Sequence, residues 1–167
     1  MTRNSNQQGL KIYKWADIST LASKLQADGS TLALCHGVFD LLHPGHIQHF
    51  KVARKLAEVL IVSITADVFV NKGPGRPIFN QEIRAETLAA LQDVDYVVIC
   101  ENPTAIELLN EIKPNYYVKG SDYLNAGDDV TAAAQPSSPT TLAPLVHVSC
   151  TTTRASSGSP GLSSRQM

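Results

Sequence analysis

The chain has 167 residues, of which 43% are hydrophobic and 17% charged, and its formal net charge is −1. This length suits one domain with a sizeable core, and the near-zero charge argues against a dedicated nucleic-acid-binding protein. No apolar run is long enough to span a membrane and no signal-peptide core opens the chain, so we expect neither membrane contact nor secretion. The three cysteines are far apart, which disfavours a disulfide framework or a structural zinc site and makes a cytoplasmic location the default.

Apolar runs and helical periods alternate along the first 124 residues. The strands lack polar alternation, which is typical of burial on both faces, and the helices between them imply parallel crossovers. We therefore expect an α/β, Rossmann-like three-layer domain with a parallel sheet of about five strands, whose ligands bind at the carboxyl ends of the strands. In chain order the pattern predicts a helix at 18–26, a strand at 31–35, a helix at 45–57, a strand at 59–64, a helix at 81–91, a strand at 96–99, a helix at 103–112 and a strand at 116–118.

Two of these helices have recognisable starts. Asn80 is the expected N-cap of the helix at 81–91, because its side-chain oxygen can accept a hydrogen bond from a backbone N–H of the first turn. Pro103, behind Asn102, is the expected first residue of the helix at 103–112, since proline has no N–H to leave unpaired there.

Composition changes near residue 125. All ten aromatic residues lie at or before Tyr123, and Ser, Thr, Pro and Gly supply 21 of the last 43 residues. We predict a folded core over 1–124, a linker with one candidate last strand (within 142–148) over 125–153, and a loose tail over 154–167.

The segment His36–His46 (HGVFDLLHPGH) joins the strand at 31–35 to the next helix. His43 and His46 are three residues apart, so both lie at the first turn of that helix, where free N–H groups and the helix dipole favour an anion. Gly37 and Gly45 have no Cβ to keep a phosphate from the backbone. Two imidazoles can donate hydrogen bonds to a phosphate whose charge grows in a transition state. The pattern predicts a phosphate site; the alternatives are a plain polar turn and a zinc site, for which the sequence places no third ligand.

This segment resembles the HxGH signature of the cytidylyltransferase-like nucleotidyltransferases. The resemblance extends over about Thr31–Tyr123. It includes a basic loop at Asn71–Pro77 (NKGPGRP), a helix-to-strand segment with Arg84, and Val118–Tyr123 (VKGSDY). The last stretch looks like the VKGxDY sequence of the adenylyltransferase domain of ADP-heptose synthase, which is the most similar subgroup by these motifs.

The resemblance implies that the chain transfers NMP from ATP or CTP to a sugar phosphate of the heptose-phosphate kind and releases pyrophosphate. Mg²⁺ would accompany the triphosphate, with no metal ligands assigned to the protein, and a homodimer is left open. A CTP-dependent cytidylyltransferase for a small phospho-alcohol or phosphonate, and a catalytically weak nucleotide-binding module, are the alternatives. The implied catalytic residues are His43, His46 and Lys72, and the implied nucleotide-binding residues are Gly37, Phe39, Asp40, Gly45, Arg84, Gly120 and Asp122.

Several of these residues have a structural alternative. Phe39 could belong to the core, and Asp40 could cap a turn. Lys72 could be a solvated loop charge, and Arg84 could pair with Asp93 instead of a phosphate.

Overall fold

The computed structural model describes residues 11–120 and 145–148. Its strands are β1 (Ile12–Tyr13), β2 (Leu32–Gly37), β3 (Val59–Thr65), β4 (Tyr96–Cys100), β5 (Tyr116–Gly120) and β6 (Leu145–Val148). They form one all-parallel sheet in the order β1-β4-β3-β2-β5-β6. The helices are α1 (Ile18–Ala27), α2 (Pro44–Leu56), α3 (Gln81–Ala89) and α4 (Ile106–Ile112), with 3-10 turns η2 (Trp15–Asp17) and η3 (Asp67–Phe69).

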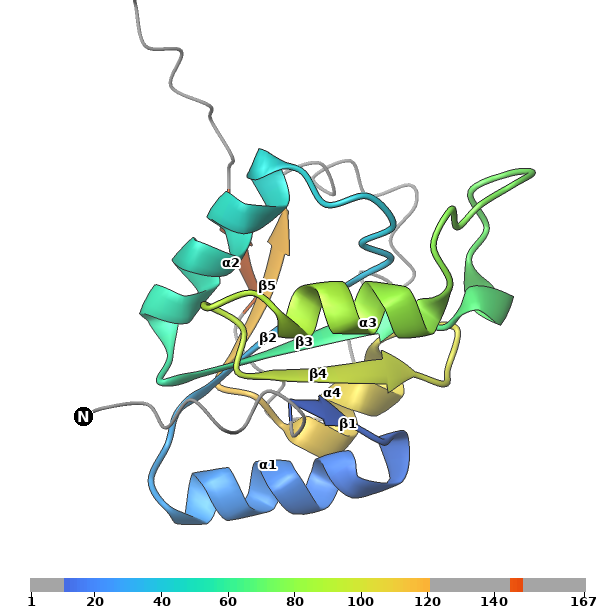
Figure 1. Cartoon of the computed structure of the whole chain (residues 1–167). Helices are drawn as coiled ribbons and strands as arrows, with labels where there is room; N and C mark the ends of the chain where they lie inside the picture. Colours follow the sequence, from blue (N-terminus) through green and yellow to red (C-terminus); the bar gives the residue numbers. More distant parts are fainter. Residues whose placement is uncertain (1–10, 121–144, 149–167) are drawn as a thin grey trace, which may run out of the picture.

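The helices cover both faces of the sheet, which gives the three layers expected from the sequence. In Figure 1, α1 and α4 lie below the sheet, whereas α2 and α3 lie above it. Alternate residues of a strand therefore enter different cores. In β2, Leu32 and Leu34 pack on the side of α1 and α4, whereas Ala33 and Cys35 pack on the side of α2 and α3. This arrangement explains why the strands read as unbroken apolar runs.

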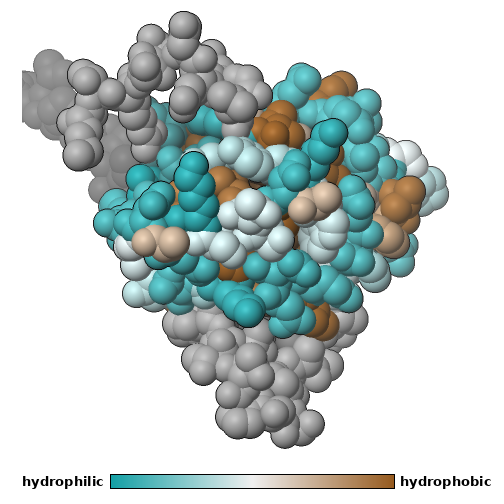
Figure 2. All heavy atoms as spheres, turned by 90° about the horizontal axis from the view of Figure 1, so that it is seen from below, coloured by the Kyte–Doolittle hydropathy of each residue, from teal (hydrophilic) through white to brown (hydrophobic). Residues whose placement is uncertain are grey.

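The surface on the α1 side is mainly hydrophilic, with apolar residues in small separate groups (Figure 2). This pattern follows from α1 itself, which turns Ile18, Leu21 and Ala22 inward. None of the helices within 11–120 is both long enough and apolar enough to cross a membrane.

The structure adds one strand to the expected elements and moves two of their boundaries. β1 was missed because two residues are too short to show a period. β2 continues through His36 to Gly37, so the histidine-rich segment begins inside the sheet. α4 begins at Ile106, not Pro103, because the Thr104 hydroxyl accepts a hydrogen bond from the N–H of Ile106 at 3.3 Å.

Other expectations are confirmed. The Asn80 side chain accepts a hydrogen bond from the N–H of Ile83 at 2.9 Å and caps α3. The run at 142–148 supplies β6, which pairs with β5 and so belongs to the same sheet. The remainder of 125–153 and the expected tail at 154–167 lie outside the described residues.

Candidate active site

The direction in which strands are added reverses between β2 and β5. From β2 the sheet grows through β3 and β4 on one side, and through β5 and β6 on the other. Such a reversal opens a crevice at the carboxyl ends of the two strands, where α/β proteins bind ligands. Cys35 is in register with Val118, so Gly37 and Gly120, each two residues further on, end the two strands at the same level. The candidate site therefore lies at the carboxyl ends of β2 and β5, next to Gly37 and Gly120.

A tight turn follows β2. Phe39 has a φ of 48°, in the left-handed region, and its ring folds back over Gly37. Phe39 is 9% exposed, and its ring packs edge-on against Phe50 and His46, with ring centroids 5.2 and 5.3 Å apart. Phe39 thus belongs to the core on one side and supports a site histidine on the other. A side chain at position 37 would collide with the Phe39 ring, so this position needs glycine for a reason that the sequence did not reveal.

The two histidines of the HxGH segment are stacked. The ring centroids of His43 and His46 are 3.8 Å apart and the rings are inclined by 28°. His43 is the N-cap of α2, and its Nδ1 accepts a hydrogen bond from the N–H of Gly45 at 3.1 Å. An accepting Nδ1 carries no proton, so a neutral His43 carries its proton on Nε2, where it can be donated to a ligand.

The first turn of α2 offers fewer free N–H groups than the sequence suggested. Pro44 has none, and the Gly45 N–H bonds the His43 ring. The N–H groups of His46 and Ile47 both bond the His43 carbonyl, at 2.9 and 3.3 Å. The turn therefore acts on an anion mainly through the helix dipole and the His43 side chain, unless a ligand displaces these bonds.

Asp40 is placed differently from the expected nucleotide wall. Its side chain is buried and points to the loop between β3 and α3, where its carboxylate accepts hydrogen bonds from Arg76 Nη1 (2.8 Å) and from the N–H groups of Ile78 (2.7 Å) and Phe79 (3.2 Å). Burial disfavours the charged form, but these bonds outweigh it and hold the pKa of the Asp40 carboxyl below its usual value.

Arg84 is a buried residue that links several segments by hydrogen bonds, and we call it a brace for that reason. Only 1% of the residue is exposed, and its guanidinium donates to the carbonyls of Phe79 (3.0 Å), Thr65 (2.9 Å) and Val38 and to the carboxylate of Asp67. Four of its five N–H donors are thus engaged within the protein, which leaves little for a triphosphate. Arg84 does form an ion pair within the protein, but its partner is Asp67 and not Asp93, the partner considered from the sequence.

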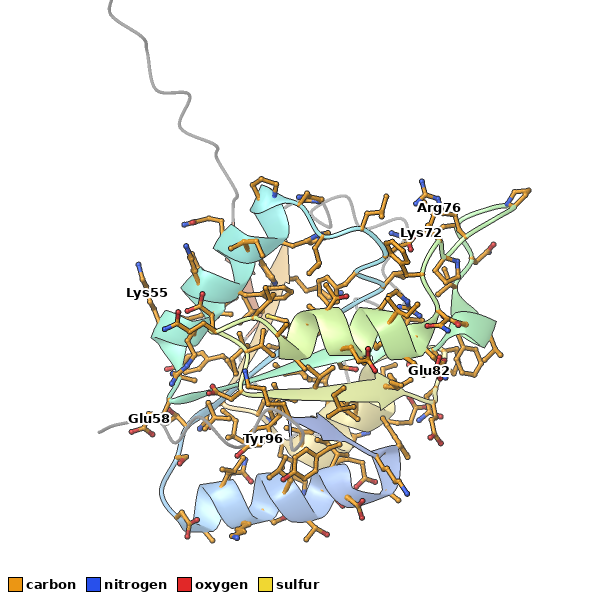
Figure 3. The ribbon with its side chains drawn as sticks, in the orientation of Figure 1. Lys55, Glu58, Lys72, Arg76, Glu82 and Tyr96 are labelled. Carbon is orange, nitrogen blue, oxygen red and sulfur yellow. The ribbon has the colours of Figure 1, made fainter. Side chains whose placement is uncertain are left out.

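Three expected site residues are still to be placed, and the structure describes two of them. Lys72 is exposed on the loop that also carries Arg76 (Figure 3). Gly120 ends β5, and a Cβ built on it would meet nothing within 4 Å. Asp122 lies outside the described residues.

Two polar clusters near the site were missed from the sequence. Asp67 and Gln81 hold each other reciprocally: the Gln81 side chain accepts from the Asp67 N–H at 3.0 Å, and the Asp67 carboxylate accepts from the Gln81 N–H at 3.1 Å. The two residues are 14 positions apart, which hides this pairing in the sequence. The one available signal was Arg84 on the apolar side of a helix, because a buried charge needs a partner within the protein.

The second missed cluster lies across the sheet beneath the crevice. His36 Nδ1 is 3.1 Å from Ser63 Oγ, and its Nε2 is 3.4 Å from Thr65 Oγ1. Burial, and to a smaller extent the positive charge of Lys119, lower the pKa of His36 to about 4. His36 is therefore neutral at neutral pH and serves the packing of β2 against β3.

An open hollow of about 500 Å³ runs along the outer face of α2. It borders the candidate site only at His43, and neither Gly37 nor Gly120 lines it, so we place the chemistry at the strand ends and not in this hollow. The described residues contain no group of three or more His, Cys, Asp or Glu side chains arranged to hold a metal ion. The described cysteines, Cys35 and Cys100, are both buried and free.

The fold, the crevice between β2 and β5 and the stacked histidines at the start of α2 are those of a nucleotidyltransferase domain. The chain belongs to the cytidylyltransferase-like family, whose model matches residues 34–139.

Individual relatives agree with this assignment. The chain is 45% identical over 129 residues to the bifunctional protein HldE of Aliarcobacter butzleri, an alignment covering 76% of this chain and 26% of that protein. It is 37% identical over 125 residues to the HldE of Magnetococcus marinus, covering 74% of this chain and 26% of that protein. The chain thus spans about a quarter of the length of these relatives.

A solved structure has the same fold. The lipopolysaccharide core biosynthesis protein of Thermoplasma volcanium superposes with a TM-score of 0.61 at 25% identity. The superposition covers 72% of this chain and 97% of the other.

Proposed function

We propose that this domain transfers a nucleoside monophosphate from ATP or CTP to a phosphorylated sugar. An oxygen of the acceptor phosphate attacks the α-phosphorus, the bond from that phosphorus to the bridging oxygen breaks, and pyrophosphate leaves. The stacking of His43 on His46 at the first turn of α2 carries the proposal, because it brings two donors to one phosphate-sized position beside a helix N-terminus.

Each histidine has a separate support. The Gly45 N–H occupies His43 Nδ1, which leaves Nε2 as the donor of a neutral His43 ring. The Phe39 ring packs against His46 at nearly a right angle, with an interplanar angle of 81°. Because both rings are oriented before the substrate binds, little reorganisation is needed when negative charge develops on the α-phosphate.

Lys72 and Mg²⁺ would complete the neutralisation of the triphosphate. Lys72 is exposed on a loop at the same edge of the sheet and would contact phosphate oxygens as a mobile charge. Mg²⁺ would arrive with the nucleotide and be held mostly by phosphate oxygens and water, a mode of binding that needs few protein ligands and so fits these residues.

The acceptor class rests on similarity. The VKGSDY stretch resembles the adenylyltransferase domain of ADP-heptose synthase, the matched curated relatives are HldE proteins, and the similar solved structure is a lipopolysaccharide core biosynthesis protein. These favour ATP and a heptose-phosphate-like sugar over CTP and a small phospho-alcohol or phosphonate.

Pyrophosphate release by the full chain tests the proposal. ATP, CTP, GTP and UTP, each with Mg²⁺, would be paired with heptose 1-phosphate, glucose 1-phosphate, glycerol 3-phosphate and a phosphonate. We expect release with ATP and heptose phosphate that depends on both substrates. Release only with CTP and a small acceptor would establish the alternative, and tight binding of ATP without release would reduce the domain to a nucleotide-binding module.

A further inference from the structure

The loop between η3 and α3 is fastened to the rest of the protein at two levels. At its base, Asp67 and Gln81 hold each other, and Arg84 ties both ends of the loop to the end of β2. Higher up, the buried Asp40 carboxylate holds the Arg76 side chain and two backbone N–H groups of the loop. The chain between these fastenings is therefore shortened to a small tip.

This tip carries the loop lysine. Residues 71–75 are all exposed, and Gly73 and Gly75 have φ values of 90° and 72°. Lys72 lies four residues before Arg76, so the position of Arg76 limits where the lysine can reach. Of the three hydrogen bonds that Asp40 accepts from the loop, the one from Arg76 is the strongest, because both groups are charged. The side chain of Asp40 is only 6% exposed, and that of Arg76 is 41% exposed.

The same short turn supports the histidines. Phe39 packs edge-on against His46, while the next residue, Asp40, holds the loop of Lys72. The two phosphate-binding elements of the proposed site are therefore joined through two consecutive residues. Phe39 lies in the left-handed region, an unfavourable conformation for a non-glycine residue that persists because the contacts around this junction hold it.

We infer that Asp40 and Arg76 are positioning residues that set Lys72 relative to the His43–His46 pair, an inference that rests on the proposed function. The carboxylate of Asp40 is buried and directed at the loop, from which it accepts three hydrogen bonds, so its role is to hold the loop. Arg76 acts through the loop and leaves the phosphate contact to Lys72.

A double-mutant cycle between Arg76 and Lys72 tests this relationship. Arg76→Ala and Lys72→Ala should each lower kcat/KM for the nucleotide, by roughly 10- to 100-fold for a misplaced charge. If Arg76 serves only to place Lys72, the double variant is no worse than Lys72→Ala alone. Arg76→Lys, which can still reach the carboxylate, should recover part of the loss. Arg54→Ala is the matched control, since it breaks the Arg54–Asp95 ion pair of 3.2 Å outside the site.

Asp40→Asn separates positioning from direct contact by Arg76. The amide can still accept from the Ile78 N–H but has no charge to hold the guanidinium. If Arg76 is a positioning residue, Asp40→Asn lowers kcat/KM as Arg76→Ala does and is non-additive with Lys72→Ala. If Arg76 itself binds phosphate, Asp40→Asn leaves activity unchanged or raises it, and the inference is wrong. Additive losses of Arg76→Ala and Lys72→Ala would overturn it as well.

A failure of the proposed function can be told apart from a failure of this inference. If the unchanged chain releases no pyrophosphate with any pair of substrates, that proposal is overturned. The same cycle is then run on ATP and adenosine affinities by calorimetric titration. Non-additive losses confined to ATP uphold the inference, whereas additive losses, or no binding of ATP at all, overturn it.

Discussion

The ring of Phe39 lies so close to Gly37 that a Cβ at position 37 would be 3.1 Å from its Cζ and 3.2 Å from its Cε2. The ring has little room to retreat, because Phe50 and His46 contact it on other sides. The absence of a Cβ at Gly37 therefore leaves the space that the Phe39 ring needs in order to support His46.

Gly37→Ala should consequently impair activity more than stability. We expect a loss of about 1–3 kcal/mol in the free energy of unfolding from overpacking, together with a larger loss of kcat as His46 is displaced. Denaturant unfolding and steady-state kinetics of the variant measure the two effects. Gly29→Ala is a useful comparison, because a Cβ there meets nothing within 4 Å although the φ of 85° is strained. Unchanged kcat in Gly37→Ala would show that the ring does not set the histidine.

Replacing His43 or His46 by Ala should lower turnover by at least about 10²-fold, the usual effect of losing one donor to a transition state. Since His43 also caps α2, His43→Ala should cost about 1 kcal/mol of stability. His43→Asn keeps an acceptor for the Gly45 N–H and should restore stability but not turnover. Near-normal kcat in either alanine variant at saturating acceptor would contradict the catalytic role.

Lys72→Ala should weaken the binding of ATP more than the binding of adenosine. The ammonium group is exposed and acts on phosphate charge, so added salt should narrow the difference between the unchanged chain and the variant. Calorimetric titration at two salt concentrations measures this. An equal loss for ATP and adenosine would place Lys72 outside the phosphate site.

Arg84→Ala should destabilise the protein by about 3–5 kcal/mol, because it leaves Asp67 and three backbone carbonyls without their donor. Arg84→Lys should recover only part of this, since an ammonium group cannot reach the same set of acceptors. Thermal unfolding provides the measurement. If Arg84→Lys keeps its melting temperature but loses ATP affinity, the arginine binds nucleotide and is not a brace.

His36 should make stability fall in mild acid. Its folded pKa of about 4 lies below the ordinary 6.5, so the unfolded chain binds more protons between these values. The stability contributed by neutral His36 is complete above pH 6.5 and decreases as pH falls towards 4, by about 3 kcal/mol in total. The pKa of His49 is also lowered, mainly by burial, and adds a slope of the same sign.

Denaturant unfolding across this pH range measures the slope, and His36→Gln is the matched variant. Glutamine can still hydrogen-bond Ser63 but does not titrate, so the slope should become shallower in His36→Gln. An identical slope in both proteins would show that His36 binds protons equally in the folded and unfolded states, so that its pKa is not lowered by folding.

Most of the helices and the longer strands could be predicted because each of them has a local signal in the sequence. The four longer strands are apolar on both faces, and α3 begins at a residue whose side chain caps it. The histidine pair was predictable for the same reason, since three-residue spacing at a helix start brings side chains together whatever surrounds them.

Asp40 and Arg84 were given roles that their contacts do not favour. Asp40 meets Arg76 from 36 positions away, and Arg84 meets Val38 from 46. Only the assembled sheet brings these partners together, and the charge of a residue does not reveal whether its partner is a ligand or another segment. β1 escaped prediction because its two residues form a strand only by pairing with β4.

The closed base of the loop also bears on how this domain can diversify. Asp67, Gln81 and Arg84 fasten both ends of the loop to the strands. Residues 71–75 are exposed and lie between these ends. Insertions or exchanges within those five positions leave the sheet, the brace and the histidines in place. The tip can thus change in length and charge around Lys72 without altering the folded base, so the phosphate contacts of such a domain can diverge while its sheet stays the same.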